Sequence, residues 1–193
     1  MADLSSRPDW DRLYEIAAGQ AGLFTLRQAA EAGYSPQLLV HHGRGGRVAR
    51  VRRGIYRIVH FPAGESQELV EVWLWSERAG VFSHETALAL LELSDVLPAS
   101  LHLTLPLSWK RRRLRVPEGV AVHHADIPGE ERTWFDAVPI TTPARALNDC
   151  AIAGLSPELL KQGAQQALRR GLVARSDLGH VEAVLEPFGG LAA

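Results

Sequence analysis

The spacing of apolar residues changes once within the first sixty residues, from a helical repeat to the alternation of a strand. This change limits the folds that the segment can adopt. Apolar residues recur at helical spacing in three short stretches, at residues 10–18, 25–32 and 36–42. After Gly43, Gly45 and Gly46 the pattern alternates over residues 48–58, and Arg53-Gly54 forms a turn signal inside it. The sequence therefore predicts three short helices followed by a β-hairpin.

Capping residues mark where each of these helices begins. Asp9 precedes the first helix, Thr25 and Gln28 form a T-x-x-Q capping box at the second, and Ser35 stands before Pro36 at the third. Leu38, Leu39 and Val40 are expected to give the third helix its buried side. Three helices and a hairpin in this order predict a winged helix-turn-helix, which places its third helix in the major groove of DNA.

Arginine is concentrated in the same segment. Residues 27–57 hold seven arginines against one acid, Glu31, although the net charge of the whole chain is −1. Residues 61–193 hold 12 basic and 17 acidic residues. Such asymmetry favours nucleic-acid binding by the basic part, and the alternative is a merely solvated arginine face. The residues predicted to contact DNA are Arg27, Ser35, Gln37, His41, Arg44, Arg47, Arg50, Arg52, Arg53 and Arg57.

The rest of the chain mixes helical and strand patterns without regular alternation. Helices are predicted at residues 66–79, 84–93 (capped by Ser83), 143–152, 157–170 and 177–185, and strands at 101–105 and 120–124. We expect an α+β protein, with a winged helix-turn-helix over residues 1–61 and a mixed α/β domain over 62–193. A basic loop between the two strands is a candidate contact for phosphate or an acidic partner, through Lys110, Arg111, Arg112, Arg113 and Arg115.

Motifs for catalysis or metal binding are incomplete. His84-Glu85 begins like a zinc-protease helix, but Leu88 stands where the second histidine is required. In each of the pairs His41-His42 and His123-His124 the neighbours point to different sides, so a pair offers one ligand to any site. Cys150 lies in an apolar stretch and is expected to be an inert packing residue. We predict no enzyme activity, no metal and no cofactor.

Composition limits the cellular setting. The chain is 46% hydrophobic and 22% charged, which is typical of a folded protein. Its apolar runs are shorter than the roughly 18 residues of a membrane span, and it has one cysteine and no secretory signal pattern. We therefore expect a cytoplasmic protein without a membrane partner.

Four segments, in order, resemble the AbiEi-like antitoxins of type IV toxin-antitoxin systems. They are residues 23–29 (LFTLRQA), 51–57 (VRRGIYR), 83–88 (SHETAL) and 138–147 (VPITTPARAL). The resemblance implies a winged-helix repressor that binds inverted repeats in its own promoter, as a monomer or dimer. It also implies that the C-terminal domain is an antitoxin domain acting against a nucleotidyltransferase toxin. Some longer relatives carry a nuclease-like extension after this region, and we do not expect nuclease activity in this chain.

Two alternatives remain beside this interpretation. One is an orphan winged-helix regulator without a toxin partner. The other is a nucleic-acid-processing enzyme that would use His84, Glu85, Asp126 and the basic loop, although a paired-carboxylate motif is missing.

Overall fold

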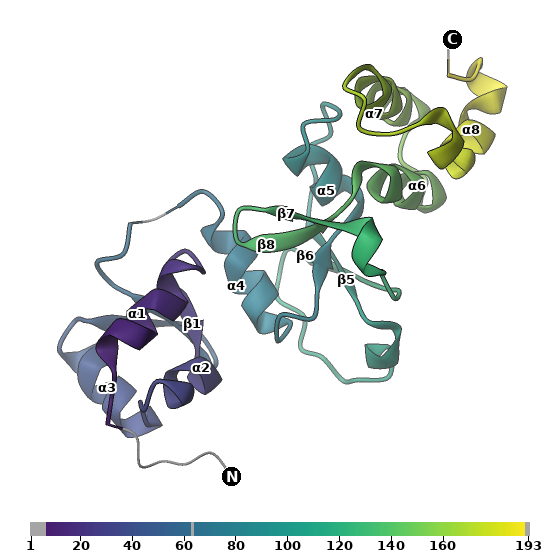
Figure 1. The fold of residues 1–193 in the computed structure, drawn as a ribbon. Coiled ribbons are helices and arrows are strands. Elements are labelled where there is room, and N and C mark those ends of the chain that lie inside the picture. The colour runs from purple at the N-terminus through teal and green to yellow at the C-terminus, as the bar shows by residue number, and fades with distance from the viewer. Residues whose placement is uncertain (1–6, 63, 192–193) are drawn as a thin grey trace. The chain divides into compact units, whose positions relative to one another are not determined.

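Two compact units make up the chain, Met1–Arg78 and Ala79–Ala193. They are seen in a computed structural model that describes residues 7–62 and 64–191 (Figure 1). The described residues form helices and two separate sheets, so the predicted α+β class is confirmed. Within them, no helix is long and apolar enough to cross a membrane.

The first unit consists of short helices and a three-stranded sheet. Its elements are α1 (Trp10–Ala18), β1 (Leu23–Thr25), α2 (Leu26–Glu31), α3 (Pro36–Arg44), β2 (Val48–Arg52), β3 (Ile55–Ile58) and α4 (Gln67–Trp75). The sheet has the order β1-β3-β2 with antiparallel pairing throughout. The three helices and the hairpin predicted for this segment are thus confirmed, whereas β1 is an additional strand that the sequence pattern did not indicate.

The predicted caps are present at the helix starts. The side chain of Asp9 accepts a hydrogen bond from the backbone N–H of Arg12 at 3.0 Å. Thr25 and Gln28 form the reciprocal capping box of α2. These helices pack their apolar sides, together with the inner face of the sheet, into one core that includes Leu13, Phe24, Leu39, Val48 and Ile58.

Val40, which was expected on the buried side of α3, is exposed, and so is Val51, an apolar residue of the hairpin pattern. Val40 is 55% exposed, because it lies about 100° around α3 from the buried Leu39, toward the exposed Gln37 and Arg44. Val51 is 38% exposed. Val51 lies three positions after the buried Val48, so strand alternation turns it to the opposite face. The pairing of β2 with β3 also shifts between Arg50 and Arg52, which places Val51 in a bulge.

The second unit contains a mixed five-stranded sheet of order β6-β5-β4-β8-β7. Its strands are β4 (Val81–Phe82), β5 (Leu101–Leu105), β6 (Val120–His124), β7 (Arg132–Phe135) and β8 (Val138–Thr141). Its helices are α5 (His84–Leu90), α6 (Pro143–Ala153), α7 (Pro157–Arg169) and α8 (Gly179–Leu185), with 3-10 turns at Leu107–Trp109, Gly129–Glu131, Arg175–Asp177 and Glu186–Phe188. The predicted strands and the positions of the predicted helices are confirmed, and β4, β7 and β8 are additional.

Helices α5, α6, α7 and α8 pack together and bury a core that includes Leu88, Leu147, Cys150, Leu160 and Val181 (Figure 1). The predicted cap of α5 is wrong in one respect, since the Ser83 side chain makes no capping hydrogen bond. Its Oγ lies instead 2.7 Å from Thr104 Oγ1 on β5.

Helix α4 lies in the first unit, where it contacts β1 and β3. It ends at Trp75, before the predicted Ala79, because Glu77 and Arg78 have positive φ angles of 55° and 65° that a helix does not allow. The compact unit therefore runs past Phe61 to Arg78. The prediction that the DNA-binding domain ends at residue 61 and the second domain begins at residue 62 stays a prediction.

Candidate nucleic-acid interface

Helix α3 is fixed in the first unit by its N-terminus and by one buried side chain. Ser35 Oγ accepts a hydrogen bond from the backbone N–H of Leu38 at 3.2 Å, and Pro36 occupies the first turn. Leu39 is 1% exposed and belongs to the core. The orientation of the helix about its own axis is therefore set by packing, which determines the side that it turns to solvent.

The outer side of α3 presents Gln37, His41 and Arg44, all of which are exposed. At about 100° per residue these three positions fall within an arc of roughly 60°. Val40 borders the same arc. The face thus combines an amide, an imidazole and a guanidinium, and each of these groups can form hydrogen bonds with the edges of bases.

The two neighbouring histidines of α3 have different surroundings. His42 is half-buried, its ring stacks on Trp10 with centroids 6.1 Å apart, and it meets the edge of Tyr34 at 5.5 Å. Burial, with a smaller contribution from the positive charge of Arg47, lowers the pKa of His42. His42 is therefore a packing residue, and His41 is the member of the pair available to a ligand.

The hairpin of β2 and β3 adds exposed arginines. Arg47, Arg50 and Arg53 are exposed, and Arg50 Nε donates a hydrogen bond to the backbone oxygen of Arg52 at 3.3 Å. Within residues 7–62 and 64–191, the side chains of Arg44, Arg47 and Arg53 have no hydrogen-bond or ion-pair partner. No acidic side chain of the described part of the unit pairs with these positive charges.

Other predicted contact residues already have partners. Arg52 Nε lies 2.7 Å from Glu71 Oε1 on α4, and Arg57 donates to the backbone oxygen of Phe61 at 3.0 Å. Arg27 pairs with Glu31 on α2 at 3.5 Å, in an exposed position. Since Ser35 caps α3 and Arg50 donates to the Arg52 backbone, five of the ten predicted residues are held by contacts within the first unit.

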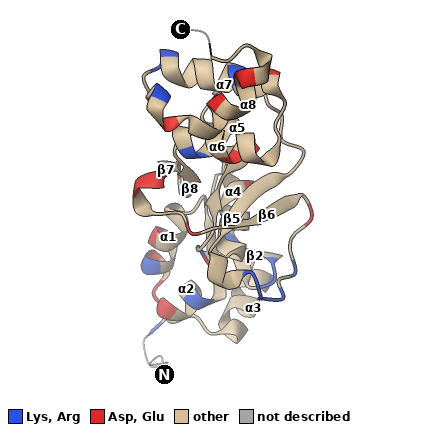
Figure 2. Cartoon of the chain, turned by 90° about the vertical axis from the view of Figure 1, so that its right-hand side faces the viewer, with Lys and Arg blue, Asp and Glu red and all other residues tan. Residues whose placement is uncertain are grey.

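The basic loop lies between β5 and β6 in the second unit, as the sequence predicted. Its five basic side chains are all exposed, namely those of Lys110, Arg111, Arg112, Arg113 and Arg115. The Arg112 guanidinium stands 3.8 Å from the centroid of the Trp109 ring, so a cation–π contact orders the first part of the loop. Helix α7 of this unit carries both acidic and basic residues, whereas α8 carries the acidic Glu182 and neither Lys nor Arg (Figure 2).

The residues considered for catalysis do not form one group. Asp126 Oδ1 accepts a hydrogen bond from the backbone N–H of Leu107 at 3.0 Å and so orders the start of the basic loop. His84 lies instead with His102 and His123, a grouping that the sequence analysis missed. Local spacing gave no signal for it, because the three histidines come from three different elements.

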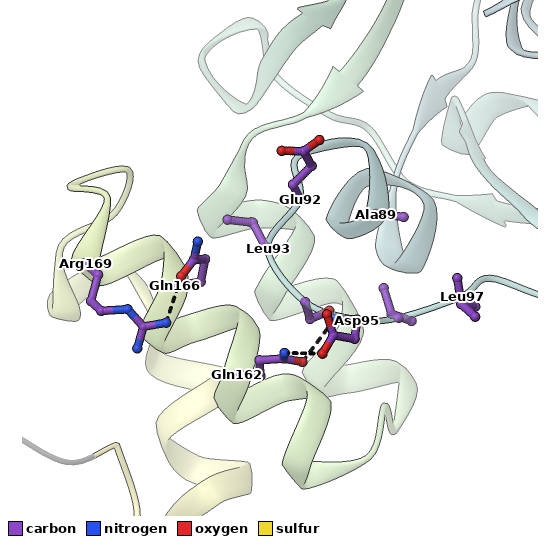
Figure 3. Close-up of a pocket in the computed structure, with 10 residues that line it drawn as sticks. Ala89, Glu92, Leu93, Asp95, Leu97, Gln162, Gln166 and Arg169 are labelled. Atoms are coloured by element: carbon purple, nitrogen blue, oxygen red, sulfur yellow. Dashed lines mark hydrogen bonds between the residues drawn. The ribbon is translucent and has the colours of Figure 1, made fainter. Parts of the chain in front are cut away.

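A hollow of about 650 Å³ runs between the end of α5 and α7 (Figure 3). The Gln162 amide donates to Asp95 Oδ2 at 2.7 Å and accepts from the backbone N–H of Asp95 at 3.0 Å. Arg169 donates to Gln166 at 2.7 Å. Most of the polar side chains at this hollow therefore pair with one another rather than with a ligand.

Comparison with known proteins finds a family match for one segment of the chain. Residues 11–59 match the model of the family described as "Transcriptional regulator, AbiEi antitoxin". The resemblance drawn from the sequence is thereby confirmed for this segment, which holds α1 to β3 and the exposed side of α3. The match supports a regulatory role of the antitoxin kind.

The crystal structure of the RV2827C protein from Mycobacterium tuberculosis is similar to the chain at 16% identity, with a TM-score of 0.46. The similarity covers 98% of this chain and 81% of that chain. A likeness of this degree does not decide the fold. No curated protein matches the sequence.

Proposed function

We propose that residues 1–61 form a winged helix-turn-helix that binds DNA in a sequence-specific way. On this proposal the chain represses its own operon as the antitoxin of a type IV toxin-antitoxin system. The observation that carries the proposal is the exposed polar side of α3 beside a hairpin with unpaired arginines. Both lie in the segment that matches the regulator family.

Helix α3 and the hairpin of β2 and β3 have different roles in recognition. In the major groove, Gln37 reads adenine and Arg44 reads guanine through paired hydrogen bonds, while His41 between them contacts a base edge or a phosphate. Arg47, Arg50 and Arg53 on the hairpin contact the phosphate backbone or a narrow minor groove and release counterions whatever the bases are. Sequence preference then belongs to α3, and most of the salt dependence belongs to the hairpin.

Inverted repeats in the promoter follow from the same geometry. One copy of the chain offers one α3 and therefore reads one half-site. An operator with two inverted half-sites binds two copies, related by a two-fold axis. Neither a cofactor nor a metal takes part in this binding.

Replacement of Arg44 by Ala tests the proposal on the DNA upstream of the gene. We expect operator affinity to fall by about 1 to 3 kcal/mol, or roughly 5- to 150-fold, with a much smaller loss on random DNA. Binding is measured by fluorescence anisotropy at fixed salt. Arg169→Ala in the second unit removes the same charge far along the chain and serves as the matched control. Equal losses on both duplexes would mean that Arg44 contacts phosphate only.

The antitoxin role requires a toxin. We expect a nucleotidyltransferase gene beside this one, whose expression alone arrests growth and whose co-expression with this chain does not. Repression of the promoter without relief from the toxin would assign the chain to the orphan regulators. Turnover of nucleic acid by the purified chain would contradict the non-enzymatic role.

The basic loop at 110–115 is a further contact to phosphate or to an acidic surface of the partner. Its five exposed cations support this role. Replacing Lys110 and Arg111 by Ala distinguishes the two ligands. A change in the slope of log DNA affinity against log salt concentration indicates that the loop contacts phosphate. An unchanged slope with weaker toxin relief indicates the partner.

A further inference from the structure

Three histidines from separate elements of the second unit converge. His84 is the first residue of α5, His102 lies on β5 and His123 lies on β6. One ring nitrogen from each lies within 4.8 Å of the others, and all three side chains are half-buried. In the parallel pairing of β5 and β6, His102 is opposite Ala121 and Thr104 is opposite His123. Both strand histidines therefore project from the same face of the sheet.

The donor atoms can be assigned from the hydrogen bonds. His102 Nδ1 and His123 Nε2 are 3.0 Å apart. His84 Nδ1 lies 2.8 Å from Ser83 Oγ, and Ser83 Oγ lies 2.7 Å from Thr104 Oγ1. Because a hydroxyl engages Nδ1 of His84, its Nε2 is the nitrogen left for a ligand. A histidine held at one nitrogen by a polar group while the other faces an ion is the usual arrangement around bound metals.

The distances fit a small divalent ion after limited movement. Tetrahedral geometry with zinc–nitrogen bonds of about 2.0–2.1 Å separates ligand nitrogens by about 3.3 Å. The His102–His123 pair is already near that value at 3.0 Å. The ring of His84 stacks on that of His123, with centroids 3.7 Å apart. To bind one ion together with His102, these two rings must rotate out of the stack, because the lone pairs of stacked rings do not converge.

Burial favours the uncharged form of two of these imidazoles, those of His84 and His123. Burial, followed by the neighbouring His123 and His102, lowers the pKa of His84 to about 3, and burial likewise lowers the pKa of His123. Neutral imidazole is the form that binds metal. His84 also has a φ of 52°, a left-handed conformation that L-residues rarely adopt and that is often kept at functional sites.

We propose that His84, His102 and His123 bind one Zn²⁺ ion, with water in the fourth position. Three nitrogen ligands suit zinc and disfavour Mg²⁺ and Ca²⁺, which take oxygen ligands. Within the described residues the group has three members, so the fourth position is open to a small ligand. The site lies in the second unit and does not depend on the proposed DNA-binding function.

Calorimetric titration of the chelator-treated full-length chain tests the site. We expect one Zn²⁺ per chain, a higher unfolding temperature with zinc, and no binding of Mg²⁺. His102→Ala should lose more than the roughly 10- to 100-fold affinity that outer hydrogen-bond partners contribute. His124→Ala is the matched control, because the next residue on β6 faces the other side of the sheet, and it should bind as the wild type does.

A second variant keeps the test valid if His102→Ala does not fold. Thr104→Val keeps the side-chain shape, releases Ser83 from its partner, and should weaken zinc binding by roughly 10- to 100-fold. Circular dichroism of the metal-free variants verifies their fold. Absence of zinc binding by the wild-type chain overturns the proposal. Equal binding by the wild type, His102→Ala and Thr104→Val overturns it as well, because the metal would then be held elsewhere.

Discussion

At the residue scale, the capping box of α2 turns out to be part of a buried network. Gln28 Oε1 accepts from the Thr25 backbone N–H at 2.9 Å, as the T-x-x-Q spacing predicted. The Gln28 amide also donates to Gln20 Oε1 at 2.9 Å, and Gln20 donates to the Leu23 backbone oxygen at 3.0 Å. Spacing along one helix could reveal the first contact. It could not reveal the contact with Gln20, because Gln20 lies outside that helix, between α1 and β1.

Removing one member of this network should destabilise the first unit. Gln28→Ala leaves the buried polar atoms of Gln20 without their partner, at about 1 to 3 kcal/mol of unfolding free energy. Urea denaturation with an unchanged m-value measures this loss. Gln37→Ala, on the exposed side of α3, is the control and should change stability by less than about 0.5 kcal/mol. Similar stabilities of the two variants would show that water replaces the missing hydrogen bonds.

Cys150 allows a second prediction at this scale. The side chain is 0% exposed, and burial raises the pKa of its thiol far above the ordinary value. Since the thiolate is the reactive form, iodoacetamide should leave the native chain unmodified and should label it rapidly in denaturant. Intact-mass spectrometry over a time course separates the two states. Fast labelling of the native chain would show that α6 opens locally.

The grouping of the three histidines in the second unit could not be predicted from local sequence spacing. His84, His102 and His123 are separated by 18 and 21 positions, a spacing without local meaning. Alternation along β5 and β6 determines which residues share a face of each strand. The register between the strands brings His102 and His123 together, and it depends on the fold of the whole unit.

At the element scale, long periodic segments were predictable and short ones were not. The helices α1, α3, α6 and α7 and the strands β5 and β6 carry clear periodicity and lie where the sequence placed them. Strand β4 has two residues, and β8 contains Pro139, which argues against a strand. Their pairing in the sheet, with Phe82 opposite Ile140, depends on contacts far apart in the sequence.

The hairpin supports a prediction that separates its arginines by role. Arg50 and Arg53 are exposed, whereas Arg52 is paired with Glu71. The double variant Arg50→Ala with Arg53→Ala should weaken operator and random DNA by similar factors. It should also lower the slope of log affinity against log salt by about one for each phosphate that an arginine no longer neutralises. Titrations of both duplexes at several salt concentrations give the slopes.

Arg52→Ala is the contrasting variant within the same hairpin. Because its side chain is partly exposed, loss of the Glu71 pair should cost about 1 kcal/mol of stability or less. Its salt slope should stay near that of the wild type. An unchanged slope in the Arg50 and Arg53 double variant, with the fold intact, would show that the hairpin does not contact DNA.

At the scale of the whole molecule, the two units have separate cores. The core around Leu13, Phe24 and Leu39 lies within residues 13–58, and the core around Leu88, Leu147 and Leu160 lies within residues 87–191. The sequence located the change in composition near Phe61 because Phe61-Pro62-Ala63-Gly64 interrupts the pattern. It could not indicate that α4, after this interruption, packs back on β1 and β3.

The position of α4 leads to a prediction about fragments. Residues 1–78 should fold cooperatively and bind operator DNA with the salt slope of the full chain, because they keep both the α3 face and the hairpin. Residues 1–61 lack the packing of α4 against β1 and β3 and the Arg52–Glu71 pair, so their unfolding temperature should be lower than that of residues 1–78.

Residues 79–193 should fold but fail to shift operator DNA, since their 13 acidic residues outnumber 11 basic ones. Thermal melts and mobility shifts of the three fragments measure these differences. Tight, sequence-specific binding by residues 79–193 would assign the DNA-binding surface to the second unit. Equal unfolding temperatures of residues 1–61 and 1–78 would show that α4 does not stabilise the first unit.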